Sequence, residues 1–368
     1  MCSRASPASW RSSDAVAPVV GGVPRAVQLE TAGVRPYLVE QGVLGSSDEA
    51  VVEPLPGGFV NRVFRVTAGG RSFVVKQGLA ESERTLLRAD VRRALMEAAA
   101  MQAIGELLGD DAPIPALLHH DPGNFVTVMT AAPSDAVLYE PELLGGRFHR
   151  GIPSRVGAYA ARLHAVTRDN VEIRTRFADN PGFALRDQSI RSASRRNPDL
   201  TESLASLLAR NRAEASALVD ADITPKNVLV HGDAVTKLDF ECTQWGDPAL
   251  DVGIVVAHYV LIAFARPAWR DAVMGEAEDF LAAYEQTSPE QLPTAFLQRS
   301  CEYAAAMMLG RVDGDLVLEY AGPHRDPVNR LGRRLLAAPP ASRPELAAVV
   351  GEALAREGAA GGEAVGRA

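Results

Sequence analysis

Residues 220–241 read DADITPKNVLVHGDAVTKLDFE, and this stretch carries most of the information about the architecture. Apolar residues on both sides of the His-Gly-Asp turn predict two short strands, over residues 228–230 and 235–238. A hairpin of this length turns the chain back on itself, which brings Asp239 beside Asn227. The stretch therefore predicts that a carboxylate and an amide from separate parts of the sequence lie together.

The polar residues of this stretch match the requirements of one reaction. Phosphoryl transfer from a nucleotide to a hydroxyl needs a carboxylate near the hydroxyl, oxygen ligands for magnesium and a cation on the phosphates. Asp222, five residues before Asn227, can be that carboxylate. Asn227 and Asp239 offer oxygen ligands of the kind that Mg²⁺ takes. Lys76, at the end of the strand-like run FVVK, can supply the cation.

The rest of the chain divides into a strand-rich part and a helical part. Residues 50–77 alternate apolar and polar side chains between Gly-rich turns, which predicts a small antiparallel meander. Apolar residues at three- and four-residue steps predict a helix over residues 81–108, and residues 125–129 predict a further strand. Helical patterns dominate over residues 153–166 and from Pro267 onward. We therefore expect an α+β fold with two lobes, an antiparallel sheet with one helix and then a mostly helical lobe.

The length of 368 residues is sufficient for two such lobes. We expect residues 1–26 to be a disordered extension and residues 27–130 to form the nucleotide-binding lobe. Residues 131–356 are expected to form the catalytic and acceptor-binding lobe. The Gly- and Ala-rich residues 357–368 are expected to be a flexible tail.

Composition and charge exclude several classes of protein. The net charge of -8 disfavours nucleic-acid binding, which needs an excess of Lys and Arg on one face. The longest apolar stretch, residues 252–265, is shorter than the roughly 20 residues that cross a bilayer, so no membrane association is expected. The weak apolar patch near the start is broken by Pro18, which favours a cytoplasmic protein over a secreted one. The three cysteines have no CxxC spacing, so neither a disulfide framework nor a zinc site is predicted.

The loop DADITPKN with LDFE downstream resembles the aminoglycoside phosphotransferase and choline kinase superfamily, which shares its architecture with protein kinases. The resemblance extends over roughly residues 30–354. It implies that Asp222 is the catalytic aspartate and that Asn227 and Asp239 bind magnesium. It also implies ATP as the phosphoryl donor, with GTP possible, and a hydroxyl of a small molecule as the acceptor.

The same resemblance assigns roles to residues outside the loop. Lys76 would be the strand lysine that binds the nucleotide phosphates, and Glu97 its ion-pair partner on the helix. Asp251 would brace the catalytic loop. The strand leading into Thr130 and Ala131 would be the hinge whose backbone contacts the adenine.

Three further residues have less specific patterns. Gly58 and Asn61 belong to a Gly-rich segment directly before the lysine strand, and this position favours a turn that holds the nucleotide phosphates. The alternative is a simple hairpin turn without a ligand. Glu241, two residues after Asp239, could either contact the metal or have no functional contact.

The chain contains a second candidate for the catalytic loop. The superfamily loop usually begins His-Gly-Asp, which occurs here at residues 231–233. The fifth residue after Asp233 is Leu238 rather than Asn, and Asp239 follows too soon for a strand pair to intervene. Spacing therefore favours Asp222 as the catalytic residue and Asp233 as a turn residue.

The acceptor is less well determined. The phrases PLPGGFVNRVFRV, FVVKQ and LGRVDG look most like methylthioribose kinases. Those kinases have a serine where this chain has Asn227, and they bind substrate with twin arginines where this chain has only Arg299. A related kinase with a different acceptor is therefore expected, either an antibiotic such as an aminoglycoside, as in antibiotic resistance, or a sugar or other metabolite.

Two other function classes, a pseudokinase and a protein kinase, fit the sequence less well. The loop begins Asp220-Ala221 instead of His-Gly, which would suit a regulatory, nucleotide-binding pseudokinase, but the intact set of reacting residues argues against it. A protein kinase needs an extended activation segment, and only eleven residues separate Asp239 from Asp251. The sequence pattern makes no prediction of the oligomeric state.

Overall fold

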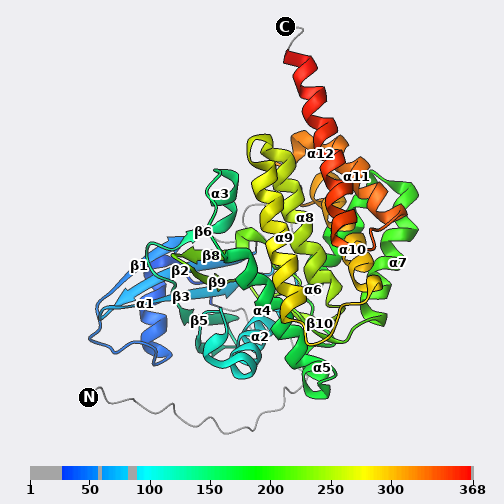
Figure 1. The fold of residues 1–368 in the computed structure, drawn as a ribbon. Helices are drawn as coiled ribbons and strands as arrows, with labels where there is room; N and C mark the ends of the chain where they lie inside the picture. Colours follow the sequence, from blue (N-terminus) through cyan, green and yellow to red (C-terminus); the bar gives the residue numbers. More distant parts are fainter. Residues whose placement is uncertain (1–26, 57–59, 82–88, 366–368) are drawn as a thin grey trace.

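The computed structural model describes residues 27–56, 60–81 and 89–365, with side chains described as far as Glu357. Figure 1 shows two lobes, a sheet with few helices at the amino-terminal end of the chain and a larger helical lobe. The predicted α+β, two-lobed arrangement is confirmed. Gly58 lies outside the described residues.

The smaller lobe is built on a five-stranded sheet in the order β1-β2-β3-β5-β4. All neighbouring strands are antiparallel, as the predicted meander requires. The β2–β3 turn contains Gly69 and Gly70, both with positive φ, a conformation that glycine adopts without steric cost. The strands are β1 Ala50–Leu55, β2 Asn61–Ala68, β3 Arg71–Gly78, β4 Leu117–Asp121 and β5 Val126–Thr130.

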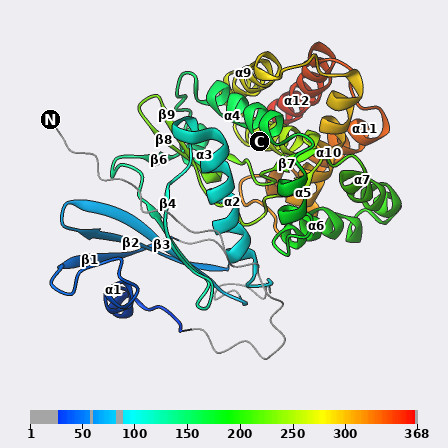
Figure 2. The same ribbon diagram turned by 90° about the horizontal axis from the view of Figure 1, so that it is seen from below.

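Two helices accompany this sheet. Helix α1, Thr31–Glu40, buries Val34 and Leu38 in one apolar cluster with sheet residues such as Val66. Helix α2, Arg93–Leu108, lies between the sheet and the helical lobe (Figure 2). Because α2 borders both lobes, a side chain on it can reach the cleft between them.

The start of α2 differs from the sequence prediction of a helix over residues 81–108. Residues 89–92 are not helical, and the helix begins at Arg93. The Asp90 carboxylate accepts the backbone N–H of Arg92 at 2.9 Å and also binds its guanidinium. This local turn competes with helix formation, a known effect of aspartate. The periodic apolar pattern could not reveal it.

The larger lobe is packed around one buried helix, α8. All residues of α8 are buried, as expected for a helix that is apolar on every side. It packs against α9 and α10, and a Cβ at Gly253 would lie 2.6 Å from the Ser300 carbonyl oxygen of α10. The helices of this lobe are α3 Tyr139–Leu144, α4 Ile152–Thr167, α5 Val171–Phe177, α6 Phe183–Ser192, α7 Thr201–Ala213, α8 Ala249–Ala265, α9 Arg270–Thr287, α10 Thr294–Asp313, α11 Arg325–Ala337 and α12 Arg343–Val365.

Throughout the described part of the chain, no single helix has the length and apolar character needed to cross a membrane. Among the described residues, one bent pair has the length and composition of a membrane span: α8 and residues 267–287, which meet at a bend of 116°.

Short strands interrupt the helical lobe, and two of them lie where the sequence predicted strands. The hairpin of β8 and β9 confirms the two strands expected on either side of the His-Gly-Asp turn. Helix α12 continues past residue 357, where a flexible tail was expected. The short strands are β6 Val137–Leu138, β7 Ala217–Val219, β8 Val228–His231, β9 Ala234–Lys237 and β10 Gln244–Gly246.

Candidate active site

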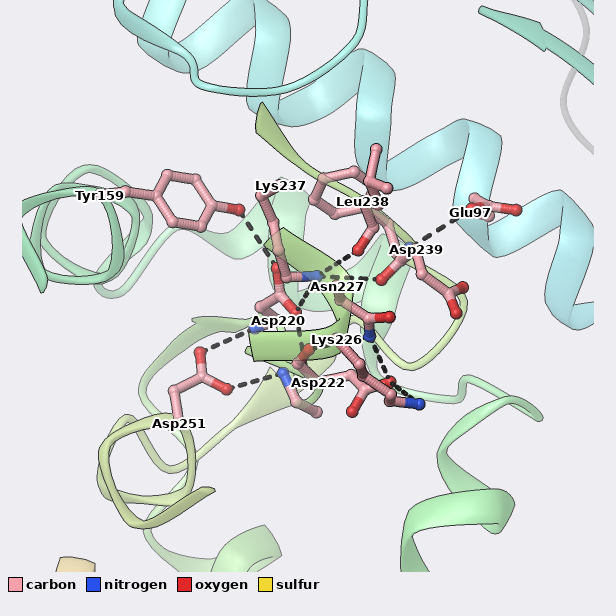
Figure 3. A network of polar contacts seen from close by, with 12 residues as sticks. Glu97, Tyr159, Asp220, Asp222, Lys226, Asn227, Lys237, Leu238, Asp239 and Asp251 are labelled. Atoms are coloured by element: carbon pink, nitrogen blue, oxygen red, sulfur yellow. Dashed lines mark hydrogen bonds and ion pairs between the residues drawn. The ribbon is translucent and has the colours of Figure 1, made fainter. Parts of the chain in front are cut away.

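The loop that follows β7 is held by the first turn of α8. The Asp251 carboxylate of α8 accepts the backbone N–H groups of Asp220 at 2.9 Å and Ala221 at 2.7 Å (Figure 3). Ala221 has a φ of 60°, in the left-handed region, which costs a non-glycine residue roughly 1–2 kcal/mol. Arg186 stabilises this turn because its Nε donates to the Ala221 carbonyl at 2.8 Å. The bracing contact predicted for Asp251 is present.

Asp222 is the next residue, and its side chain is surrounded by donors. The guanidinium of Arg186, from α6, forms an ion pair with Oδ1. The amide nitrogen of Asn227 donates to Oδ2 at 2.8 Å, and Lys226 Nζ lies 3.7 Å from the same oxygen. The 3-10 turn η4, Pro225–Asn227, places the last two groups, so the predicted five-residue spacing brings Asn227 directly to Asp222.

These donors set the charge of Asp222. Burial by itself would raise the pKa of this carboxyl, but the positive charges of Arg186 and Lys226 outweigh it. The pKa of Asp222 is therefore held well below its usual range. The side chain is an ionised hydrogen-bond acceptor at neutral pH.

A second group of charges connects the two lobes. Lys76 Nζ, from β3, lies 2.8 Å from Glu97 Oε1 on α2. The same nitrogen lies 2.8 Å from Oδ1 of Asp239, which follows the end of β9 by two residues. Burial disfavours the ammonium, but Asp239 and Glu97 outweigh it and raise the pKa of Lys76. The predicted ion pair between Lys76 and Glu97 is present, and Asp239 extends it across the cleft.

Asn227 and Asp239 fit the chemistry of a magnesium site. The amide nitrogen of Asn227 is bonded to Asp222, so its oxygen remains for a cation. The Leu238 N–H donates to the Asn227 carbonyl at 2.8 Å, which fixes the position of the next residue, Asp239. No group of three or more His, Cys, Asp or Glu side chains in the described ranges could hold a metal alone. The two residues therefore suit a hard cation that completes its shell with phosphate oxygens and water.

A buried lysine that the sequence analysis did not single out links the loop to this site. Lys237 is 2% exposed, and its Nζ lies 2.9 Å from Asp220 Oδ1. The same ammonium donates to the carbonyls of Leu238 at 2.7 Å and Asp239 at 3.1 Å (Figure 3). Burial raises the pKa of Asp220, and the charge of Lys237 opposes that rise. Lys237 thus joins the start of the catalytic loop to the end that carries Asp239.

We expect Lys237→Met to lower the free energy of unfolding by about 3–5 kcal/mol, because it leaves Asp220 charged and unpaired inside the protein. The loss should be smaller at pH 5 than at pH 8. Removing Lys237 raises the folded-state pKa of Asp220 further above its unfolded value, so stability falls as the pH rises between the two values. Urea unfolding at both pH values measures this effect. The double variant Lys237→Met, Asp220→Asn should recover part of the loss, and no recovery would contradict the pairing.

Asn61 and Glu241 meet in another contact across the cleft. Asn61 Nδ2, at the start of β2, donates to Glu241 Oε2 at 3.1 Å. Arg93 Nε, at the start of α2, donates to the same oxygen at 3.0 Å. The structure shows Glu241 bonded to protein side chains, and a metal contact by Glu241 is not tested. Phosphate binding by Asn61 stays a prediction.

The predicted hinge residues lie where the lobes join, at the end of β5. The Thr130 N–H donates to the Ala116 carbonyl at 3.0 Å, and the Ala131 N–H donates to the Ser72 carbonyl at 3.3 Å. A nucleotide base could use these N–H groups only by displacing those bonds. Their role in adenine binding stays a prediction.

Asp233, the alternative catalytic residue, and Arg299, the possible substrate-binding residue, both lie in structural positions. Asp233 is exposed in the tight turn between β8 and β9, as predicted, and Gly232 in that turn has a φ of 56°. Arg299, expected where methylthioribose kinases bind substrate, has its Nε 2.7 Å from the buried Asp247 carboxylate. Arg299 is therefore committed to a structural ion pair.

The sequence analysis missed Arg186, Lys226 and Lys237. Arg186 comes from a helix with no local signal, and only the fold brings it to Asp222. The lysines did have a signal, because the chain has 38 Lys and Arg residues and only three are lysines. All three lie in this site, and Lys76 is the third.

The two lobes and the charges between them define a phosphotransferase of kinase-like architecture. The model of the phosphotransferase enzyme family matches residues 51–292, more than half of the chain. The chain belongs to this family.

Solved structures support the same architecture. A choline/ethanolamine kinase family protein from Mesorhizobium loti is 19% identical, with a TM-score of 0.54 over 87% of this chain and 99% of that chain. An ethanolamine kinase from Plasmodium vivax is 12% identical, with a TM-score of 0.52 over 83% of this chain and 86% of that chain. At these identities the likeness establishes the shared fold. No curated protein matches the chain significantly.

Proposed function

We propose that this protein is an ATP- and magnesium-dependent kinase that transfers the γ-phosphoryl group to a hydroxyl of a small molecule. The observation that supports this most strongly is the bridge from Lys76 to both Glu97 and Asp239 across the cleft. A lysine held in this way presents a fixed positive charge beside the residues suited to a metal. The family match and the Asp222–Asn227 pair support the same reaction.

Asp222 is the carboxylate that orients the acceptor hydroxyl and accepts its proton. Its low pKa makes it a weak base, but the transition state for phosphoryl transfer is loose and depends mainly on positioning and electrostatic stabilisation. Arg186 and Asn227 fix both carboxylate oxygens, so an incoming hydroxyl meets an oriented acceptor for its proton. The proton moves from the hydroxyl to Asp222 as the new oxygen–phosphorus bond forms, while the bond from the γ-phosphorus to the β–γ bridging oxygen breaks and ADP leaves.

Three other residues would hold the nucleotide. Lys76 would bind the phosphates, and Asn227 and Asp239 would hold magnesium through their oxygens. The ion, when bound, neutralises charge on the phosphate oxygens. Binding at Asp239 would share its carboxylate between the cation and Lys76, which keeps both positive charges near the phosphates.

A screen for nucleotide consumption tests the proposal directly. ATP and GTP with magnesium would be incubated with aminoglycosides, other antibiotics, methylthioribose, choline and sugars, and the Asp222→Ala protein would serve as the blank. Turnover with one acceptor class that is absent from the blank is the expected result. Nucleotide binding without turnover for any acceptor, and without hydrolysis that depends on Asp222, would favour a pseudokinase.

We expect Lys76→Ala to raise the KM for ATP by roughly 10- to 100-fold, the effect of losing one charge-assisted contact. Steady-state kinetics at saturating acceptor measure this. Arg71→Ala, at the exposed start of the same strand, is a control that should leave the KM for ATP unchanged. An unchanged KM in Lys76→Ala would remove this residue from the nucleotide site.

A further inference from the structure

A cluster of polar side chains from the helical lobe lies near Asp222 and has no part in the proposed nucleotide site. We call Glu140, His258, Arg311 and Tyr320 the acceptor-side cluster. Glu140 belongs to α3, His258 to α8 and Arg311 to α10, and Tyr320 precedes α11. The Tyr320 hydroxyl donates to Glu140 Oε1 at 3.2 Å. Helix α3 packs against η4 of the catalytic loop. Met307, one turn before Arg311 on α10, lies 3.7 Å from the Arg186 guanidinium that pairs with Asp222, so the cluster borders the catalytic loop.

Several buried polar atoms near Asp222 have no hydrogen-bond partner. Arg311 is 5% exposed, and within the described ranges its Nη1 donates to the Leu316 carbonyl at 3.3 Å while its Nε has no partner. Both ring nitrogens of the fully buried His258 lack a partner, and so does the Thr224 hydroxyl in the catalytic loop. Buried polar atoms in proteins are normally hydrogen-bonded. A bound molecule would supply the missing partners.

Arg311 also has no ion-pair partner among the described residues. No carboxylate of the described residues lies within ion-pair distance of it, whereas Arg186 is paired with Asp222. Burial, followed by the charge of Arg186, lowers the pKa of Arg311 to about 10, so it remains protonated at neutral pH. A buried charge is costly unless it is paired.

The remaining members of the cluster do not provide that pairing. Burial raises the pKa of Glu140 against the opposing effects of the Tyr320 hydroxyl and the charges of Lys226 and Arg311. Its carboxylate accepts the Tyr320 hydroxyl, and the described residues show no ion pair between Glu140 and Arg311. Burial, followed by the charge of Arg311, keeps the pKa of His258 well below its usual range. His258 is therefore a neutral ring that can donate one hydrogen bond and accept another.

We propose that the acceptor carries a carboxylate or phosphate group that binds Arg311 while its hydroxyl faces Asp222. The inference rests on the proposed function and narrows its substrate class. A planar guanidinium binds carboxylate and phosphate oxygens with two parallel hydrogen bonds, which matches the donors that Arg311 has free. A polycationic acceptor such as an aminoglycoside would instead place ammonium groups beside this buried positive charge.

Matched sets of acceptors test the proposal. Gluconate, glucose and glucosamine form one set, and glycerol 3-phosphate, glycerol and 3-aminopropane-1,2-diol form the other. Nucleotide consumption is expected with the anionic member of a set and not with its neutral or amine partner, and the two sets distinguish carboxylate from phosphate. Turnover with only neutral or amine acceptors would overturn the inference and leave the proposed kinase activity standing.

Variants of Arg311 provide the second part of the test. Arg311→Gln should raise the KM for the anionic acceptor by roughly 10- to 100-fold, with the KM for ATP within twofold of wild type. Arg311→Lys keeps the charge and should retain the preference for anions. Arg334→Gln, an exposed position on α11, should change nothing. An Arg311→Gln protein with wild-type kinetics would contradict the inference.

A binding measurement covers the case in which none of these acceptors is turned over. Calorimetry without nucleotide would compare gluconate and glycerol 3-phosphate for the wild-type and Arg311→Gln proteins. Binding that is lost in the variant supports the inference, and no binding of either anion to the wild type contradicts it. Hydrolysis of ATP that depends on Asp222 is measured separately, so failure of the anion site is distinguished from failure of the proposed function.

Discussion

Asp222→Asn is expected to lower kcat by roughly 10²- to 10⁴-fold, the usual contribution of a general base. Asparagine keeps the shape of the side chain but loses the negative charge that receives the hydroxyl proton. Affinity for ATP should change little, because Lys76, the residue proposed to bind the phosphates, pairs with Glu97 and Asp239 and not with Asp222. Single-turnover kinetics with the identified acceptor, together with ATP binding by calorimetry, measure the two effects.

A matched control separates this role from the His-Gly-Asp motif. Asp233→Asn makes the same substitution in the exposed turn and should leave kcat unchanged. Asp222→Asn also leaves the buried Arg186 without its ion-pair partner, so some loss of stability is expected. Retained ATP binding would show that the variant is folded. A large loss in Asp233→Asn with full activity in Asp222→Asn would show that the other register is correct.

Asp239→Asn is expected to lower activity by about a thousandfold or more at every magnesium concentration. The substitution removes the negative charge proposed to bind the cation and also breaks the ion pair with Lys76. Metal catalysis contributes several kcal/mol of charge stabilisation, so extra magnesium should not restore the rate. A titration of activity against magnesium from micromolar to high millimolar levels measures this.

The control for Asp239 is Asp135→Asn. Asp135 is an exposed residue that pairs with His231, so the magnesium dependence of this variant should equal that of the wild type. An Asp239→Asn protein that recovers full activity at high magnesium would show that Asp239 is not essential to the metal site. Activity that is unchanged at all concentrations would exclude the metal role altogether.

The part of the site that depends on short-range spacing could be predicted from the sequence. Asp222 and Asn227 are five residues apart in one loop, and the strand pair fixes Asp239 relative to them. The turn chemistry of the hairpin also explains why residues 231–233 form a tip and not a catalytic loop. Local patterns were sufficient here because Asp222, Asn227 and Asp239 lie in one loop and the hairpin that directly follows it.

Other features depend on contacts between distant segments. Arg186 lies 36 residues before Asp222 on a helix without a distinctive pattern, and only the packing of α6 against the loop shows their ion pair. Arg311 belongs to the phrase LGRVDG, which resembles a phrase of methylthioribose kinases. Its burial depends on the packing of α10 and does not follow from this local pattern. The predicted start of α2 was wrong because the turn at Asp90 depends on a side-chain hydrogen bond to the backbone.

The gathering of all lysines in one cleft gives the protein an unusual chemical selectivity. Apart from the terminal amine, reagents that modify amino groups have targets only at Lys76, Lys226 and Lys237. Lys76 and Lys237 are buried, whereas the Lys226 side chain is 39% exposed and 3.7 Å from Asp222. Apart from the terminal amine, an acylating or fluorescent amine label would therefore report mainly on the catalytic loop beside Asp222. The other 35 of the 38 Lys and Arg residues are arginines, whose guanidinium groups stay protonated and do not react with amine labels.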